Sequence, residues 1–127
     1  MLRLNLTRRA VWHDLGHGVR LLCGPVTSGV LSAARLDPVV AALISPPDGA
    51  SSPALDGIRR DAVALAIAKS IARQVVQDWE GVGDEHGEPL SPSPDAVDVL
   101  LDLQPLFEAF QALVVAPAML LVTEKNG

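Results

Sequence analysis

The sequence predicts an α+β protein in which a small N-terminal β-hairpin packs with four or five α-helices. Near the N-terminus apolar residues alternate with polar ones, which is the period of a half-buried strand; further along they recur every three or four positions behind helix-capping residues. Of the 127 residues 49% are hydrophobic, but only two are Trp, two are Phe and none is Tyr. Ala, Val and Leu must therefore fill the core, which favours packed helices over a large sheet. The length indicates a single domain spanning residues 1–127.

Residues 1–24 are expected to form the β-hairpin region. Gly16-His17-Gly18 supplies the turn, and Gly24-Pro25 ends the pattern. The alternating positions are Leu2, Leu4 and Leu6, then Val11, His13 and Leu15, and after the turn Val19, Leu21 and Cys23. Residues 25–44 then predict two short helices, one capped by Thr27 or Ser28 and one started by Asp37-Pro38. Residues 45–53, rich in Pro, Gly and Ser, predict a linker.

Residues 54–79 predict the longest helix. Its apolar stripe consists of Ile58, Ala62, Leu65, Ala72, Val75 or Val76, and Trp79. Between Ala62 and Ala68 no residue is charged, and apolar side chains extend nearly around the helix axis. This stretch must be covered on both sides, either by the rest of the domain or by a second molecule.

Residues 80–91 predict an acidic hairpin, and residues 92–124 predict the C-terminal helices. The first of these helices starts at Ser93-Pro94 and the last at Pro105, because proline is favoured in the first helical turn. Inward positions of the shorter helix are Val97, Leu100 and Leu101; the last helix has the stripe Leu106, Phe107, Phe110, Leu113, Val114, Leu120 and Leu121. Pro117 predicts a kink in that helix, and residues 124–127 are expected to fray.

Two groups of residues contain donor types that could support chemistry, but neither completes a known pattern. His13, Asp14, His17 and Cys23 lack the spacing of a four-ligand zinc site, and an apolar surrounding is expected to raise the pKa of Cys23. Glu80, Asp84, Glu85 and Glu88 lack the alternating ligands of a calcium-binding loop. We therefore expect no cofactor, no metal and no catalysis, and interpret the acidic group as a solvated rim or a docking patch.

The charge is divided unevenly along the chain. Residues 1–35 carry five Arg against one Asp, a net charge of +4, whereas the remainder carries five basic against fourteen acidic residues, a net charge of −9. Such a division could support head-to-tail pairing in a homo-oligomer or with another protein, and the overall charge of −5 argues against nucleic acid. Charged residues interrupt the N-terminus, so no signal peptide is expected. The most apolar segment, residues 113–122, is well short of the roughly 20 residues of a membrane helix.

Several segments resemble small tail assembly proteins of long-tailed bacteriophages, prophages and gene transfer agents. The segments that carry the resemblance are residues 78–95 (DWEGVGDEHGEPLSPSPD), residues 12–20 and 27–37 upstream, and residues 106–111 and 124–126 downstream. The resemblance implies a non-catalytic tail assembly chaperone that binds the tape-measure protein and presents it to tail-tube subunits in the bacterial cytoplasm. Two alternatives stay open: a structural virion component, such as a connector or tail-completion protein, and a small metal-dependent enzyme using His13, His17 and the acidic hairpin.

A chaperone for a long apolar helix needs an apolar groove rimmed by charge. At helical spacing the groove candidates are Val63, Ile67 and Ile71 on the long helix with Phe107, Phe110 and Val114 on the last helix. Trp79 is a candidate anchor, with the core edge as its alternative place. Glu80, Asp84 and Glu85 are the candidate acidic contacts.

Overall fold

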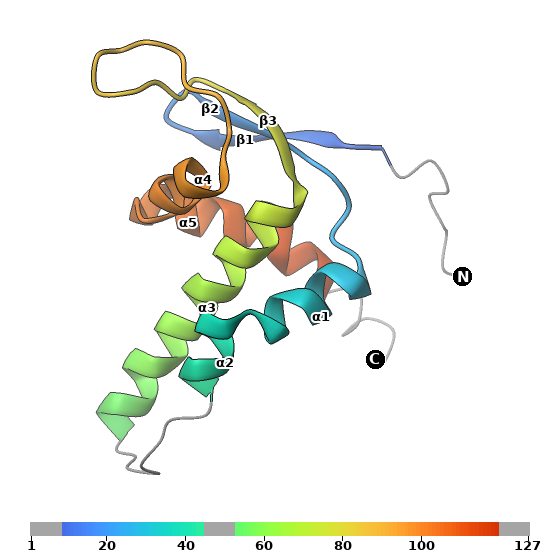
Figure 1. The fold of residues 1–127 in the computed structure, drawn as a ribbon, viewed down its shortest axis with the longest axis vertical. Helices are drawn as coiled ribbons and strands as arrows, with labels where there is room; N and C mark the ends of the chain where they lie inside the picture. Colours follow the sequence, from blue (N-terminus) through green and yellow to red (C-terminus); the bar gives the residue numbers. More distant parts are fainter. Residues whose placement is uncertain (1–8, 45–52, 120–127) are drawn as a thin grey trace.

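The structure is a computed structural model that describes residues 9–44 and 53–119. It consists of a three-stranded antiparallel sheet that packs on helices (Figure 1). The strands, in sheet order, are β1 (Val11–Gly16), β2 (Val19–Cys23) and β3 (Val76–Glu80). The helices are α1 (Ser28–Leu36), α2 (Pro38–Ile44), α3 (Pro53–Val75), α4 (Pro94–Leu101) and α5 (Gln104–Phe110), which continues through the π-helical turn η1 (Gln111–Val115). The predicted α+β class is confirmed.

The N-terminal hairpin forms as its alternation predicts. β1 pairs antiparallel with β2, with His13 opposite Leu21, and the turn residues Gly16, His17 and Gly18 all have positive φ angles. Glycine adopts such angles without steric cost, which explains why two of the three turn residues are glycines. Three predicted features lie outside the described residues: the alternation of Leu2, Leu4 and Leu6, residues 45–52 of the predicted linker, and the C-terminal end with Leu120 and Leu121. The last residue of the predicted linker, Pro53, begins α3.

The predicted helix over residues 54–79 is wrong at its C-terminal end. α3 ends at Val75, and residues 76–80 form β3, which pairs with β2 so that Trp79 lies opposite Leu21. Consecutive β-branched residues at Val75 and Val76 favour a strand, and the edge of β2 supplies backbone partners that no local pattern reveals. The predicted two-stranded hairpin therefore becomes a three-stranded sheet.

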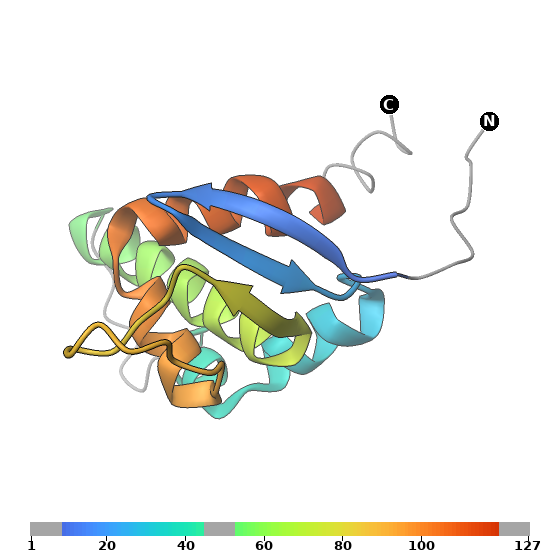
Figure 2. The ribbon, with the colours of Figure 1, turned by 90° about the horizontal axis from the view of Figure 1, so that it is seen from above.

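One face of the sheet is covered by helices and the other is not, as the view from above shows (Figure 2). The covered face carries the buried side chains of Leu15, Val19, Leu21, Cys23 and Trp79. The outer face carries Arg20, which forms an ion pair with Glu80 on the neighbouring strand at 3.0 Å. The Arg20 guanidinium also lies 5.0 Å from the ring centre of Trp12, a cation–π distance.

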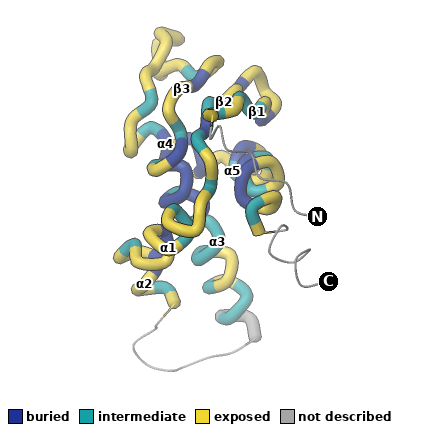
Figure 3. Tube along the Cα trace, turned by 90° about the vertical axis from the view of Figure 1, so that its right-hand side faces the viewer, coloured by how far each residue is buried: buried dark blue, intermediate teal, exposed yellow. Residues whose placement is uncertain are grey.

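The core lies where the sheet meets α4, α5 and the C-terminal half of α3 (Figure 3). Phe110 and Ile71 are completely buried there. The predicted inward residues of α4, namely Val97, Leu100 and Leu101, are also buried. Burial decreases toward the N-terminus of α3, where Ile58, predicted to belong to the apolar stripe, is 66% exposed. The helix is therefore longer than the core that it packs against.

The predicted caps and the acidic hairpin are present. Ser93 accepts a hydrogen bond from the backbone N–H of Ala96 at the start of α4, and Thr27 caps α1 in the same way through Val30. In the hairpin, Gly83 bridges Pro89, and the Asp84 carboxylate accepts hydrogen bonds from the backbone N–H groups of His86 and Glu88. The hairpin projects beyond the sheet (Figure 1).

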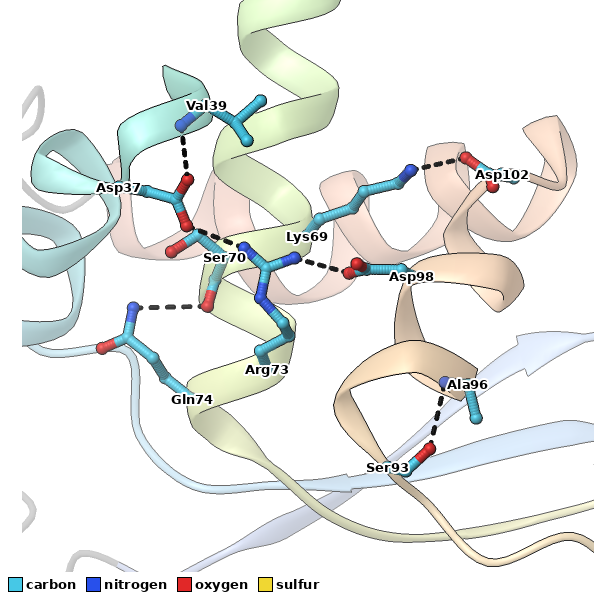
Figure 4. A network of polar contacts seen from close by, with 10 residues as sticks. All are labelled: Asp37, Val39, Lys69, Ser70, Arg73, Gln74, Ser93, Ala96, Asp98 and Asp102. Carbon is cyan, nitrogen blue, oxygen red and sulfur yellow. Dashed lines mark hydrogen bonds and ion pairs between the residues drawn. The ribbon is translucent and has the colours of Figure 1, made fainter. Parts of the chain in front are cut away.

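A polar cluster fixes α2 and α4 against α3 (Figure 4). The guanidinium of Arg73 on α3 forms ion pairs with Asp37, at 2.8 Å, and with Asp98, at 2.5 Å. Lys69, one turn earlier, pairs with Asp102. Asp37 also accepts a hydrogen bond from the N–H of Val39, so one carboxylate both starts α2 and holds it to α3.

Candidate partner-binding groove

An open apolar groove lies between the N-terminal half of α3 and the C-terminal helix. The α3 wall is made by Arg60, Val63, Ala64 and Ile67, which share one helix face because they follow the spacing i, i+3, i+4 and i+7. The opposite wall comes from η1 and the helical turn after it: Gln111, Ala112, Val115, Ala116, Pro117 and Met119. The groove encloses about 650 Å³.

The π-helical turn explains the shape of the second wall. Pro117 has no backbone N–H and its ring collides with the carbonyl four residues earlier in a regular α-helix. In the structure the N–H of Ala116 instead reaches the carbonyl of Gln111, five residues back, which widens the helix just before the proline. The predicted kink at Pro117 is thus absorbed as a widened turn, and the helix runs on to residue 119.

Among the described lining residues, only two have polar side chains. Arg60 is exposed and forms no ion pair with any described residue. The Oε1 atom of Gln111 is buried and accepts no hydrogen bond within the described part of the chain. All other lining residues are aliphatic, proline or methionine, so the groove offers an apolar surface marked by one cation.

The predicted groove residues divide between this groove and the core. Val63 and Ile67 line the groove, as expected. Ile71 and Phe110 have no exposed surface and Val114 has 6%, so these three belong to the core and were wrongly predicted to line a groove. Phe107 is partly buried against the same core. The stripe of α5 that we expected to face a partner faces the sheet and α3 instead, because that stripe holds the largest side chains available to fill the interior.

Three of the wall residues that sequence reasoning missed are small. Ala64, Ala112 and Ala116 line the groove beside Val115. Alanines give no strong hydrophobic signal, but three of them on facing helices leave space between the helices and would let a bound backbone approach closely. Their recurrence at positions 112 and 116, one turn apart, was the available signal.

Trp79 is a core anchor in the isolated chain. Its side chain is 6% exposed, and its indole Nε1 donates a hydrogen bond to the carbonyl oxygen of Leu90 at 2.5 Å. Glu80 is paired with Arg20, whereas Glu85 is exposed and lies 3.5 Å from the His86 ring. Asp84 uses its carboxylate to hold the hairpin turn. The Glu85 side chain is 86% exposed, against 56% for Glu80.

The possible metal and thiol ligands near the N-terminus are spread along the hairpin. His13 lies on β1 opposite Leu21, and His17 is at the turn. Among the described residues no three His, Cys, Asp or Glu side chains come together in a way that could hold a metal ion. Burial lowers the pKa of His13 and raises the pKa of Cys23 to about 11. Both groups are thereby kept neutral near pH 7, and the Cys23 thiol is a poor nucleophile.

A second, smaller hollow lies on the other side of the uncharged stretch of α3. This hollow has a volume of about 280 Å³ and lies between Val39 and Leu43 of α2 and Ala62, Leu65 and Ala66 of α3. The charged residues Lys69, Arg73 and Asp98 also line it. The expectation that residues 62–68 need cover on both sides is therefore met only in part by the described segments of this chain. The cations at this hollow already have carboxylate partners, which makes it the less suitable of the two for a charged ligand.

Comparison with known protein families decides the origin of the chain. Residues 50–127, more than half of its length, match the family model described as the YdaY prophage protein. The chain belongs to this family. The match contains both walls of the larger groove, whereas β1, β2, α1 and α2 precede it. In comparisons with curated proteins and with solved structures, no match reaches significance.

Membership of the YdaY prophage protein family supports the predicted phage or prophage origin. The family description does not give a molecular activity. In the part of the chain that the structure describes, no single helix is long and apolar enough to span a membrane; α4 and the helix after it meet that criterion only as a pair, bent by 104°.

Proposed function

We propose that this prophage protein is a non-catalytic tail assembly chaperone that binds an apolar helical segment of the tape-measure protein in the bacterial cytoplasm. The observation that carries the proposal is the apolar groove between α3 and the C-terminal helix, which the chain leaves unfilled among its described residues. Grooves between two helices commonly bind a third, amphipathic helix through its apolar face. The family match adds support, because it includes both walls.

The resemblance to phage tail assembly proteins makes the tape-measure protein the preferred partner. A tape-measure protein is long and helical, and before the tail tube surrounds it, its apolar surface is liable to aggregate. A small chaperone with an aliphatic groove would cover that surface until tail-tube subunits replace it. This role requires no cofactor.

Coexpression tests the proposal. The wild-type chain should raise the soluble yield of the tape-measure protein from the same prophage, and Ala112→Trp should abolish this effect by filling the groove. Ala112 is exposed, so the larger side chain enters the groove without displacing core residues. Ala33→Trp, at an exposed position of α1 outside the groove, is the matched control.

Ile67→Asp provides a second test from the opposite wall, with Ile58→Asp on the same helix as its control. Both variants need a thermal unfolding curve first, because Ile67 also packs against the core whereas Ile58 is 66% exposed. A wild-type chain that leaves tape-measure solubility unchanged would contradict the proposal. Finding the chain in stoichiometric amounts in purified particles would favour the alternative, a structural virion component.

A further inference from the structure

The charge of the groove indicates which helical segments it would select. α3 carries four cations among its described side chains, and three of them are neutralised within the chain. Arg59 pairs with Asp56, Lys69 with Asp102, and Arg73 with Asp37 and Asp98. Arg60 is the exception: it lines the groove, is exposed, and has no ion pair among the described residues.

This exception is informative because the chain as a whole is acidic. The net charge is −5, so carboxylates are the commoner charged groups, yet none of the described ones lies within ion-pair distance of Arg60. A guanidinium beside an apolar groove can form two parallel hydrogen bonds with a carboxylate, and this pairing adds orientation to an otherwise non-directional apolar contact.

The geometry of the walls indicates a helical occupant. The lining positions on α3 follow helical spacing, and the second wall is also a helix. Ala64, Ala112 and Ala116 leave room between the walls for the backbone of a bound segment. A side chain larger than alanine at these positions would fill that room. An amphipathic helix fits such a surface through side chains one turn apart.

We propose that the groove selects an apolar helical segment with an Asp or Glu beside its apolar stripe, and that this carboxylate pairs with Arg60. The inference rests on the proposed function, since it names the feature of the tape-measure protein that the chaperone would recognise. It also sets the direction of the bound helix, because the carboxylate must lie at the end of the groove that Arg60 occupies.

Peptides tiled along the tape-measure protein of the same prophage provide the test, with binding measured by calorimetry against the full chain. In the tightest-binding peptide, changing the acidic residue beside the apolar stripe to Lys should weaken binding roughly two- to fivefold, the size expected for an exposed ion pair. Arg60→Glu should weaken the original peptide by a similar factor and restore binding of the Lys peptide. Arg35→Glu, which changes an exposed arginine outside the groove, is the matched control.

The outcomes separate this inference from the function on which it rests. Coupling between the two charge reversals supports the pairing. If the two changes act additively, or if the tightest-binding peptide lacks an acidic residue, the inference is wrong, although loss of binding in Ala112→Trp would still uphold the groove. If no peptide binds, both the groove and the inference are contradicted.

Discussion

The indole Nε1 of Trp79 lies 2.5 Å from the carbonyl oxygen of Leu90, and this hydrogen bond ties β3 to the far end of the acidic hairpin. Gly81, which follows β3, lets the start of the hairpin approach the backbone of Gly18 closely. A Cβ atom at Gly81 would lie 1.9 Å from the carbonyl oxygen of Gly18 in the N-terminal turn. The hairpin is thus held by one aromatic anchor and by one position where only glycine fits.

Replacing Trp79 should separate these contributions. Trp79→Phe keeps most of the packing and loses the hydrogen bond, so the free energy of unfolding should fall by about 1 to 2 kcal/mol. Trp79→Ala also leaves a cavity, and a loss of about 3 to 5 kcal/mol is expected. Chemical denaturation followed by circular dichroism measures both. Equal losses in the two variants would show that the hydrogen bond, and not the packing, dominates.

Cys23 should make the stability fall at alkaline pH. Burial raises its pKa from the ordinary value of 9.0 to about 11. The unfolded chain therefore loses the thiol proton at a lower pH than the folded chain, so the stabilisation is complete below pH 9 and is lost as the pH rises through 11. Between pH 9 and about pH 11, the free energy of unfolding from denaturation curves should fall more steeply with pH for the wild type than for Cys23→Ala. Parallel declines would mean that the thiol is not desolvated.

The ion pairs of Arg73 should contribute more to stability than the Arg59–Asp56 ion pair of the same helix. Arg73 holds Asp37 and Asp98, whose side chains are 17% and 36% exposed, and so joins α2 and α4 to α3. Arg73→Met leaves both carboxylates unpaired and should lower the free energy of unfolding by about 1 to 3 kcal/mol. Arg59→Met breaks only the longer pair with Asp56, within one helix, and should cost less than about 0.5 kcal/mol. Similar losses in both variants would contradict the account of Arg73 as the link between helices.

Gln111 should be replaceable with a gain in stability. Its buried Oε1 accepts no hydrogen bond within the described residues, and an unpaired buried acceptor costs about 1 to 3 kcal/mol. Gln111→Leu removes that acceptor and should raise the melting temperature. Gln104→Leu, at an exposed position of α5, should have little effect. A lower melting temperature for Gln111→Leu would indicate that the amide has a partner that stabilises it.

Local patterns predicted the parts of this fold that local interactions determine. The Gly16-His17-Gly18 turn, the Ser93-Pro94 helix start and the acidic hairpin each depend on nearby residues, and each is found where the sequence indicates. β3 was missed because residues 72–79 satisfy helical spacing, and only the edge of β2, more than fifty residues earlier, turns residues 76–80 into a strand.

The groove was predicted in part for a similar reason. Val63 and Ile67 were found because they lie on the uncharged stretch of α3, whose local composition is unusual. The choice between core and groove for Phe110 and Val114 depends on how α5 is rotated against the sheet, which periodicity does not determine. The lack of an ion pair between Arg60 and any described carboxylate is a tertiary property, since it depends on which carboxylates the fold brings to the other cations of α3.

Hydrogen–deuterium exchange of the purified chain, with and without the tape-measure protein, tests the central claim most directly. Binding in the groove should slow exchange in residues 60–67 and 111–119 together, because these two segments form its walls. The outer face of the sheet and the acidic hairpin should exchange at unchanged rates. Protection confined to the hairpin at residues 82–90, with both walls unaffected, would contradict the groove as the binding site.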